Sequence, residues 1–384
     1  MANQIQKTTL RQRLRPIFAG MDVPLLLAFA LLASLGMLIM YSSGYDHGER
    51  FNQHGRNLLL AVGIMFFVAQ LSLPTIMRFA LPVYLVGLLL LVAVALFGIS
   101  RKGSTRWLNL GVIIQPSEIM KIGVPLMLAW WFQMREGQLR LLDFCVAFIL
   151  LLLPVGLIFK QPDLGTALLV LSGGLFVIYF AGLRWRWILP IFIIGAIGIG
   201  LIVFFGDPLC ADGVNWKVLR EYQRQRVCTL LDPTRDPLGR GFHIIQGMIA
   251  IGSGGFWGKG FMNGTQTHLE FIPERTTDFI FAAYSEEFGL MGNLLLIGTF
   301  LFLVYRGLVI ASQAPTQFSR LLAGAIAMIF FIYAFVNMGM VSGILPVVGV
   351  PLPFISYGGT AMTTLGLGLG ILLAISKARK IIQS

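Results

Sequence analysis

Long apolar runs without charged residues recur along almost the whole chain, and they restrict its fold more than any other feature. An α-helix rises about 1.5 Å per residue, so roughly 20 apolar residues cross the ~30 Å hydrocarbon core of a bilayer. Residues 23–41, 57–77 and 79–100 contain no charged residue, and residues 119–134 contain only Lys121. These four runs predict transmembrane helices.

Further runs bring the predicted number of spans to ten. They lie at residues 144–159, 164–183, 187–206, 288–305 and 321–376. The last run contains Pro346, Pro351 and Pro353, so we divide it into two helices. Only 12% of the residues are charged and 57% are hydrophobic, which excludes a soluble globular enzyme and a disordered chain. We expect an all-α polytopic membrane protein whose residues 1–384 form a single transmembrane domain.

The distribution of Lys and Arg predicts how the chain is oriented. An even number of spans places both termini on one side, and the short segments of that side carry fourteen Lys and Arg residues against six on the other. Short cytoplasmic loops are enriched in these residues, so both termini are predicted to be cytoplasmic. The net charge of +12 is therefore interpreted as an orientation signal and not as a nucleic-acid-binding surface.

Residues 207–280, between the seventh and eighth predicted spans, are the one long stretch with soluble character. This stretch contains eight basic and eight acidic residues together with aromatic ones, so we expect a folded outer loop. Trp216, Leu219 and Val227 fall near one helical face, which predicts an amphipathic helix at the membrane surface. A second, more buried helix is predicted at residues 244–251.

Two features of this loop leave alternatives open. Cys210 and Cys228 lie in an oxidising compartment and could form a disulfide, but two free thiols are the favoured interpretation. Residues 252–260 are rich in glycine, yet the spacing of their Gly and Lys residues does not match a phosphate-binding loop. We interpret them as a turn after a helix.

Charged residues in or beside the spans are candidate functional groups, because an unpaired and unhydrated charge is costly in hydrocarbon. Glu118 and Lys121 stand at i and i+3 where the fourth span begins, so they can pair on one helix face. A purely structural ion pair is the alternative. Arg101, Lys102 and Arg106 lie just upstream, and together these residues suit an anionic headgroup such as a pyrophosphate.

Acidic residues also occur at two outer boundaries of the spans. Lys160 and Asp163 occupy the turn between the fifth and sixth spans, where a solvated tight turn is the alternative. Glu274 and Asp278 precede the eighth span, and Phe-Ile-Phe follows Asp278. Partial desolvation makes such a carboxylate a better proton acceptor, which suits a general base. Capping of the following helix is the alternative role for Asp278.

These groups together indicate transfer of a lipid-linked group. An outer carboxylate beside a basic membrane groove suits a lipid-linked phosphate donor, although a flippase or exporter needs a similar groove. The four histidines are scattered and form no zinc-binding pattern, so no metal ligands are predicted. The sequence does not decide whether a divalent cation assists.

Several motifs resemble those of the SEDS family of shape, elongation, division and sporulation proteins. They are NMGMVSGILPVVGVPLPFISYGGTA at 337–361, QPSE at 115–118, QPDLGT at 161–166 and DPTRDP at 232–237. GKGFMNGTQ at 258–266 and FIPERTTDFIF at 271–281 look more like the elongation member than the division member. The resemblance extends from the first span to the last. Residues 346–359 are expected mainly to shape a broken helix and an outer loop.

The resemblance implies a peptidoglycan glycosyltransferase that polymerises lipid II during cell elongation at the outer face of the cell inner membrane. It also implies a class B penicillin-binding transpeptidase and other elongation-complex membrane proteins as partners. Asp278 matches the family's essential loop aspartate and would deprotonate the acceptor sugar for an inverting transfer. Residues implied in binding substrate or pyrophosphate are Arg101, Lys102, Arg106, Glu118, Lys121, Lys160, Asp163, Glu274 and Ser356. A lipid II flippase and a scaffold for the transpeptidase are the alternative functions.

Overall fold

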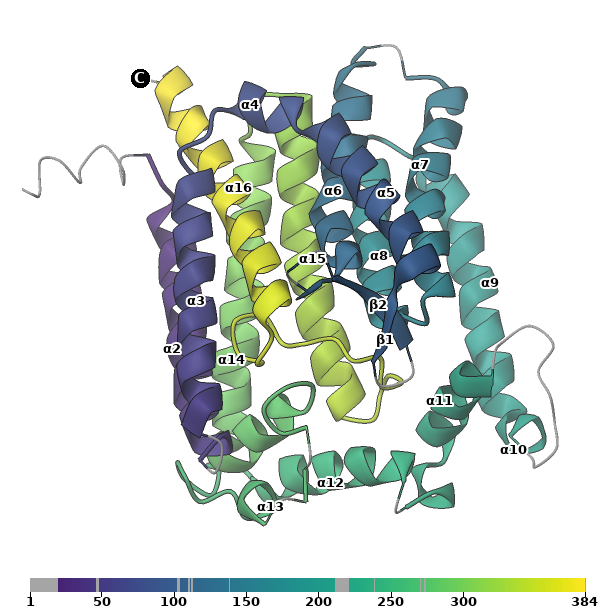
Figure 1. Cartoon of the computed structure of the whole chain (residues 1–384), viewed down its shortest axis with the longest axis vertical. Helices are drawn as coiled ribbons and strands as arrows, with labels where there is room; N and C mark the ends of the chain where they lie inside the picture. The colour runs from purple at the N-terminus through teal and green to yellow at the C-terminus, as the bar shows by residue number, and fades with distance from the viewer. Residues whose placement is uncertain are drawn as a thin grey trace, which may run out of the picture.

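The computed structural model of the chain describes residues 20–45, 48–101, 104–109, 111, 113–137, 139–210, 221–237, 239–269, 271–272 and 274–383. Most of its helices run side by side along one direction, and the two described ends of the chain lie at the same end of the bundle (Figure 1). This shared end agrees with an even number of crossings. The side of the membrane on which it lies stays a prediction.

The helices of the bundle follow the predicted spans. They are α2 (Val23–Ser43), α3 (Gly48–Val68), α4 (Leu73–Arg78), α5 (Ala80–Phe97), α6 (Pro116–Gln133), α7 (Leu141–Lys160), α8 (Leu164–Phe180), α9 (Trp185–Phe204), α14 (Ile280–Ser312), α15 (Gln317–Val341) and α16 (Gly359–Gln383). The predicted break in the C-terminal run is confirmed between α15 and α16. The boundaries predicted at 57–77 were wrong, because Pro74 lies in the first turn of the separate helix α4.

Six segments of the described residues are long and apolar enough to cross a bilayer. They are Val23–Ser43, Leu73–Phe97, Leu141–Lys160, Ile280–Ser312, Gln317–Val341 and Gly359–Ala378. The prediction of a polytopic, mainly helical membrane protein is confirmed, and the number of ten spans stays a prediction. α6 is less apolar because it carries Glu118 and Lys121, and both residues are buried within the bundle.

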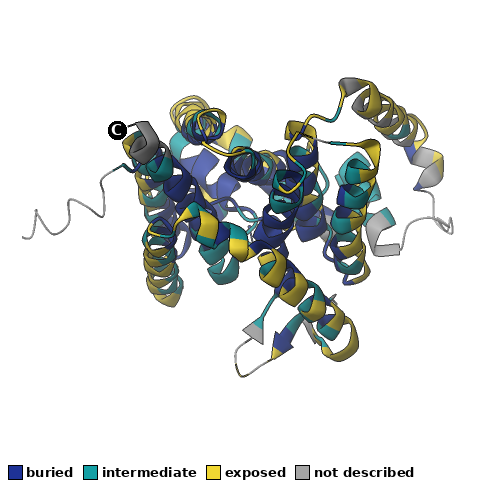
Figure 2. Ribbon diagram, turned by 90° about the horizontal axis from the view of Figure 1, so that it is seen from above, coloured by how far each residue is buried: buried dark blue, intermediate teal, exposed yellow. Residues whose placement is uncertain are grey.

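α15 lies at the centre of the bundle, against α14, α8, α6 and α16. Buried residues fill the interior and exposed residues lie on the rim (Figure 2). The exposed residues include large apolar side chains such as Leu89, Leu142 and Ile194, as expected for a surface that faces lipid. The polar side chains of Tyr333 and Asn337 on α15 are therefore surrounded by protein, not lipid.

A short antiparallel sheet joins α5 to α6, and the sequence pattern did not predict it. Its strands are β1 (Ile99–Arg101), β2 (Ser104–Asn109) and β3 (Ile113–Ile114), in the order β1-β2-β3. Ile99 pairs with Trp107, and Leu108 pairs with Ile114. Such β-branched and aromatic residues favour strands. The sheet places Arg106 next to the turn between α7 and α8.

The outer loop forms short helices across the end of the bundle opposite the chain ends (Figure 1). They are α10 (Gly206–Leu209), α11 (Glu221–Leu231), the 3-10 helix η1 (Pro233–Arg235), α12 (Arg240–Ser253) and α13 (Thr265–His268). α12 contains the helix predicted at 244–251, which is confirmed. Of the predicted amphipathic helix, Val227 lies in α11, while Trp216 and Leu219 lie outside the described residues.

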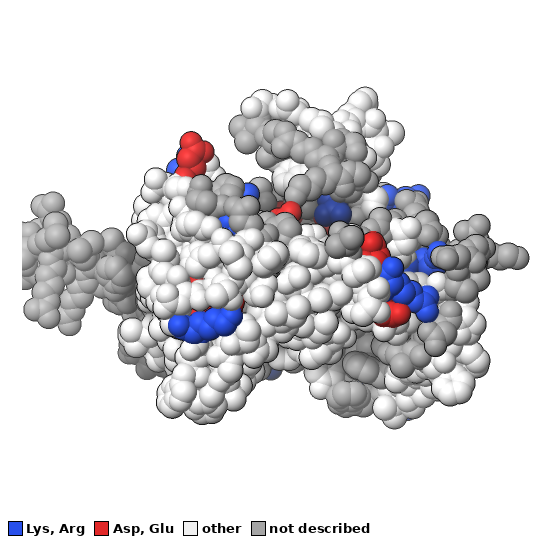
Figure 3. All heavy atoms as spheres, turned by 90° about the horizontal axis from the view of Figure 1, so that it is seen from below, with Lys and Arg blue, Asp and Glu red and all other residues white. Residues whose placement is uncertain are grey.

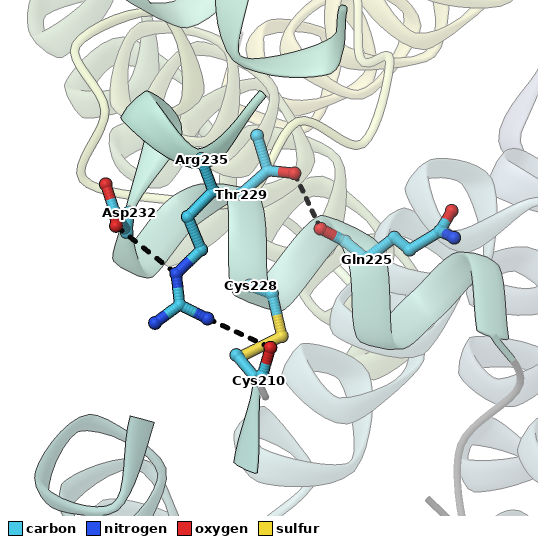
Figure 4. Close-up of a disulfide and its surroundings, with 6 residues drawn as sticks. All are labelled: Cys210, Gln225, Cys228, Thr229, Asp232 and Arg235. Carbon is cyan, nitrogen blue, oxygen red and sulfur yellow. Dashed lines mark hydrogen bonds and ion pairs between the residues drawn. A yellow bond between two sulfur atoms is a disulfide. The ribbon is translucent and has the colours of Figure 1, made fainter. Parts of the chain in front are cut away.

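Cys210 and Cys228 form a disulfide, with their Cα atoms 5.6 Å apart. The prediction of two free thiols was therefore wrong. Figure 4 shows how α10 and α11 are brought together: Arg235 donates to the carbonyl of Cys210 (Nη1···O 2.9 Å) and is paired with Asp232 (Nε···Oδ2 3.3 Å). Arg235 belongs to η1, so this contact adds a second link between the end of α10 and the segment that follows α11.

α14 bends sharply at Gly289, whose φ of 62° and ψ of −159° are not helical. The turn at residues 254–260 fills the bend. Leu290 N donates to Gly255 O (2.9 Å) and Met291 N to Phe256 O (3.2 Å), while Lys259 N donates to Glu286 O (3.0 Å). The interpretation of the glycine-rich stretch as a turn is confirmed, and the turn satisfies backbone groups that the bend releases.

Candidate active site

Asp278 lies in the turn that precedes α14, and its side chain is partly exposed. The N-cap of α14 is Phe279, and no side chain caps the helix there, so the capping role considered for Asp278 is wrong. The partial burial of the Asp278 carboxylate beside apolar residues matches the setting predicted for a general base.

The residues around Asp278 are held from several elements. Arg275 is buried, and its Nε donates to the carbonyl of Ser43 at the end of α2 (2.9 Å). The amide of Tyr357 donates to the carbonyl of Thr276 (2.8 Å), and Arg50 of α3 donates to the Thr276 hydroxyl. Because these anchors come from α2, α3 and the loop before α16, the turn is fixed relative to the bundle, which favours a preorganised carboxylate.

The loop between α15 and α16 lies directly against Asp278. A Cβ atom placed on Gly349 would be 3.3 Å from Asp278 Oδ2. On the other side, a Cβ atom on Gly165, in the first turn of α8, would be 2.8 Å from Val348 O. The segment 346–353 therefore passes between the Asp278 turn and the start of α8, where Asp163 lies.

A buried charged group lies beside this loop, on α6 and α15. Lys121 donates to Glu118 Oε1 and to the hydroxyl of Tyr333, both at 2.6 Å. The predicted pairing of Glu118 with Lys121 is confirmed. Within the described residues, Glu118 Oε2 has no hydrogen-bond partner. Tyr333 was not among the predicted site residues, because a single hydroxyl in an apolar run does not reveal which charge it contacts.

Asp163 links the start of α6 to β2. It caps α8 by accepting from Thr166 N (3.2 Å), accepts from Gln115 Nε2 (2.9 Å) and lies 3.5 Å from Arg106 Nη1. Asp163 is only 3% exposed, so the solvated-turn alternative is wrong for it. Arg106 also donates to Pro162 O (2.6 Å), while a quarter of its side chain stays exposed. Arg106 therefore presents part of a cationic side chain at the start of α8, a position that suits an anion.

The remaining predicted site residues do not all lie beside Asp278 or beside Arg106 and Asp163. Lys160 is exposed at the end of α7, and Glu274 accepts from the hydroxyl of Thr277 (2.7 Å). Ser356 is buried, and its hydroxyl accepts from Leu352 N (2.7 Å), so this hydroxyl holds its own loop; its role in binding substrate stays a prediction. The side chain of Arg101 and the whole of Lys102 lie outside the described residues.

The end of the molecule opposite the chain ends carries its charges in separate groups. Figure 3 shows Lys and Arg beside Asp and Glu at several places, with uncharged surface between them. Among the residues that the structure describes, no three His, Cys, Asp or Glu side chains converge on a point that could hold a metal ion. The groups around Asp278 and Arg106 can accept a proton and bind an anion, respectively, which is the pairing needed for transfer from a phosphate-linked donor.

The chain belongs to the family of FtsW, RodA and SpoVE proteins, because the family model described as "Cell cycle protein" matches residues 23–381. It is 46% identical over 360 residues to the peptidoglycan glycosyltransferase MrdB of Escherichia coli K12, covering 94% of each chain. It is 31% identical over 420 residues to the peptidoglycan glycosyltransferase RodA of Treponema pallidum, covering 92% of this chain and 97% of the relative.

Solved structures have the same fold. The crystal structure of the rod shape determining protein RodA of Thermus thermophilus matches with a TM-score of 0.68 and 27% identity, covering 94% of this chain and 98% of the other. A chain of a peptidoglycan synthase complex, studied for the coordination of polymerization and crosslinking, matches with a TM-score of 0.76 and 33% identity, covering 94% and 99%. The resemblance to the SEDS family is thereby confirmed.

Proposed function

We propose that this protein is a peptidoglycan glycosyltransferase that polymerises lipid II during cell elongation. Relatives that match over nearly their whole length carry the name of this activity. The observation that carries the proposal is the position of Asp278: a partly exposed carboxylate, in a turn anchored to α2 and α3, beside a loop whose other side meets the start of α8.

In the proposed reaction, Asp278 removes the proton from the 4-hydroxyl of the acceptor's GlcNAc. That oxygen attacks the anomeric carbon of the donor's MurNAc, and the bond from this carbon to undecaprenyl pyrophosphate breaks. One displacement inverts the α-linked donor to a β-1,4 linkage, so one base suffices and no covalent enzyme intermediate is needed. The proton stays on Asp278 until solvent takes it.

Arg106 is the residue best suited to stabilise charge on the departing pyrophosphate, because its side chain is partly exposed. Lys121 is buried and already bonded to Glu118 and Tyr333. We therefore assign Lys121 an indirect role, in holding the outer ends of α6 and α15 together. A divalent cation bound with the pyrophosphate would add to the same charge stabilisation.

We also propose that the protein is a multi-pass protein of the inner membrane with both termini in the cytoplasm. The orientation can be tested with two single-cysteine variants, Pro237→Cys and Glu136→Cys. Pro237 is exposed in the outer loop, and Glu136 is exposed after α6. In a Cys145→Ser background, a membrane-impermeant maleimide should label the first site in intact cells and the second only after permeabilisation. The opposite pattern would place Asp278 in the cytosol and remove the proposed mechanism.

The partners that fit this function are a class B penicillin-binding transpeptidase and other elongation-complex membrane proteins. One of the matching structures is itself a complex of polymerization and crosslinking functions. The decisive assay combines the purified protein, its transpeptidase and labelled lipid II. Wild type should form glycan strands, and Asp278→Asn should not, although it should keep the thermal unfolding midpoint of wild type.

A matched control is Glu49→Gln, which removes another exposed carboxylate at the outer end of the bundle. It should leave polymerisation unchanged. Full activity of Asp278→Asn would exclude Asp278 as the base. Movement of lipid II across vesicles without glycan formation, unaffected by Asp278→Asn, would instead identify a flippase. Normal wall synthesis after Arg106→Gln would favour a scaffold.

A further inference from the structure

α15 carries a second polar side chain one helical turn beyond Tyr333. Asn337 is 0% exposed, although it lies in a helix of mainly apolar residues at the centre of the bundle. Residues four apart lie on the same helix face, so Asn337 and Tyr333 point to the same side of α15. Burying an amide without hydrogen bonds is costly, so its contacts define what it does there.

Both donor bonds of the Asn337 amide go to backbone carbonyls of different segments. Nδ2 lies 3.0 Å from Asp278 O and 2.7 Å from Val350 O. Carbonyl oxygens only accept hydrogen bonds, so the NH2 group, not Oδ1, must face them. Within the described residues, Oδ1 has no hydrogen-bond partner. The amide is thus oriented entirely by the two carbonyls.

The two carbonyls belong to the segments that meet at the Asp278 carboxylate. Val350 directly follows Gly349, whose Cβ position is 3.3 Å from Asp278 Oδ2. In the first turn of α14, Ala282 N donates to the carbonyl of Phe279 (3.0 Å), one residue beyond Asp278. This amide is therefore not the donor that holds the carbonyl of Asp278. Asn337 is therefore a clamp between the turn that carries the carboxylate and the loop against which the carboxylate lies.

We infer that Asn337 is a positioning residue, whose amide fixes the backbone of Asp278 relative to Val350 and so aims the Asp278 carboxylate. This inference rests on the proposed function of Asp278 as the base. Asn337 does not touch the reacting atoms; it acts through the backbone of Asp278. A displacement of about 1 Å at a reacting group can cost roughly 100-fold in rate, so loss of the clamp should appear in kcat.

The test compares Asn337→Ala with Asn293→Ala in the lipid II assay, each with the transpeptidase partner. Asn293 is a matched control, because it is a half-buried amide in α14 that accepts one side-chain bond from Ser285 (2.9 Å). If Asn337→Ala is not recovered in folded form, Asn337→Ser carries the comparison, because serine is smaller and keeps one donor. Rates are expressed per folded molecule, with thermal unfolding in detergent as the measure of folding.

We expect kcat of Asn337→Ala to fall roughly 100-fold while KM for lipid II changes less than about threefold. The midpoint of the acidic limb of its pH–rate profile should also move, because the surroundings of Asp278 change. Asn337→Ser should lose less, and Asn293→Ala should keep kcat. An unchanged kcat per folded molecule, a change in KM alone, or an equal loss in Asn293→Ala would overturn the inference.

Asp278→Asn, measured alongside, separates this inference from the proposed function. If Asp278→Asn is inactive and Asn337→Ala is fully active, only the positioning role fails. If Asp278→Asn is active, the base assignment fails, and the positioning role fails with it.

Discussion

A methyl group at Gly349 would probe the position of the Asp278 carboxylate directly. The backbone of Gly349 has φ +73°, where a residue with a side chain loses roughly 1–2 kcal/mol. The added Cβ would also lie 3.3 Å from Asp278 Oδ2, a tight contact that pushes the carboxylate away by a few tenths of an ångström. We expect Gly349→Ala to lose both stability and rate, the latter by roughly tenfold or more.

Gly343→Ala separates the two effects, because Gly343 has the same φ of +73° in the same loop. Its Cβ would meet Met248 Sδ at 3.0 Å, a flexible side-chain end that can move away. Both variants should therefore lose a similar amount of stability in thermal unfolding. Only Gly349→Ala should lose kcat per folded molecule in the lipid II assay. Equal kcat values for the two variants would refute the placement of the carboxylate against Gly349.

Three further predictions concern other contacts of the structure. Tyr333→Phe removes the hydroxyl that accepts from Lys121 (2.6 Å), and the unfolding free energy should fall by about 1–3 kcal/mol; an unchanged midpoint would contradict the contact. Cys210→Ser should lower the unfolding free energy by about 3 kcal/mol, and Cys228→Ser and the double variant should each show the same loss. A double variant that loses the sum of the two single losses would show that the thiols are not bonded. Arg106→Lys keeps the positive charge but cannot contact both Pro162 O and Asp163 as the guanidinium does, so kcat/KM for lipid II should fall about tenfold. An unchanged kcat/KM would show that only the charge matters.

The membrane-embedded part of the fold could be predicted because placing a charged side chain in hydrocarbon has a high free-energy cost. Uncharged runs located the helices, and the prolines after residue 345 located the break between α15 and α16. Helix boundaries were less certain where an apolar run continues through a turn. Residues 57–77 contain such a turn, and its signals are Ser72 at the N-cap of α4 and Pro74 in the first turn of that helix.

The candidate site was predicted only in part, since sequence identifies charges in unusual places but not what they meet. Asp278, Glu118, Lys121 and Asp163 stood out for that reason. Asn337 did not, because the carbonyls it binds lie 59 and 13 positions away along the chain. Contacts over such intervals depend on how the helices pack, and no local pattern encodes them.

The bend of α14 at Gly289 has a consequence for biogenesis. A helix that leaves the translocon cannot keep such a bend in lipid, because the amides of Leu290 and Met291 would face hydrocarbon without acceptors. In the folded protein they donate to the carbonyls of Gly255 and Phe256, which are synthesised earlier. α14 therefore acquires its final shape when it meets this turn, so the loop between α9 and α14 completes the folding of the membrane part of the chain.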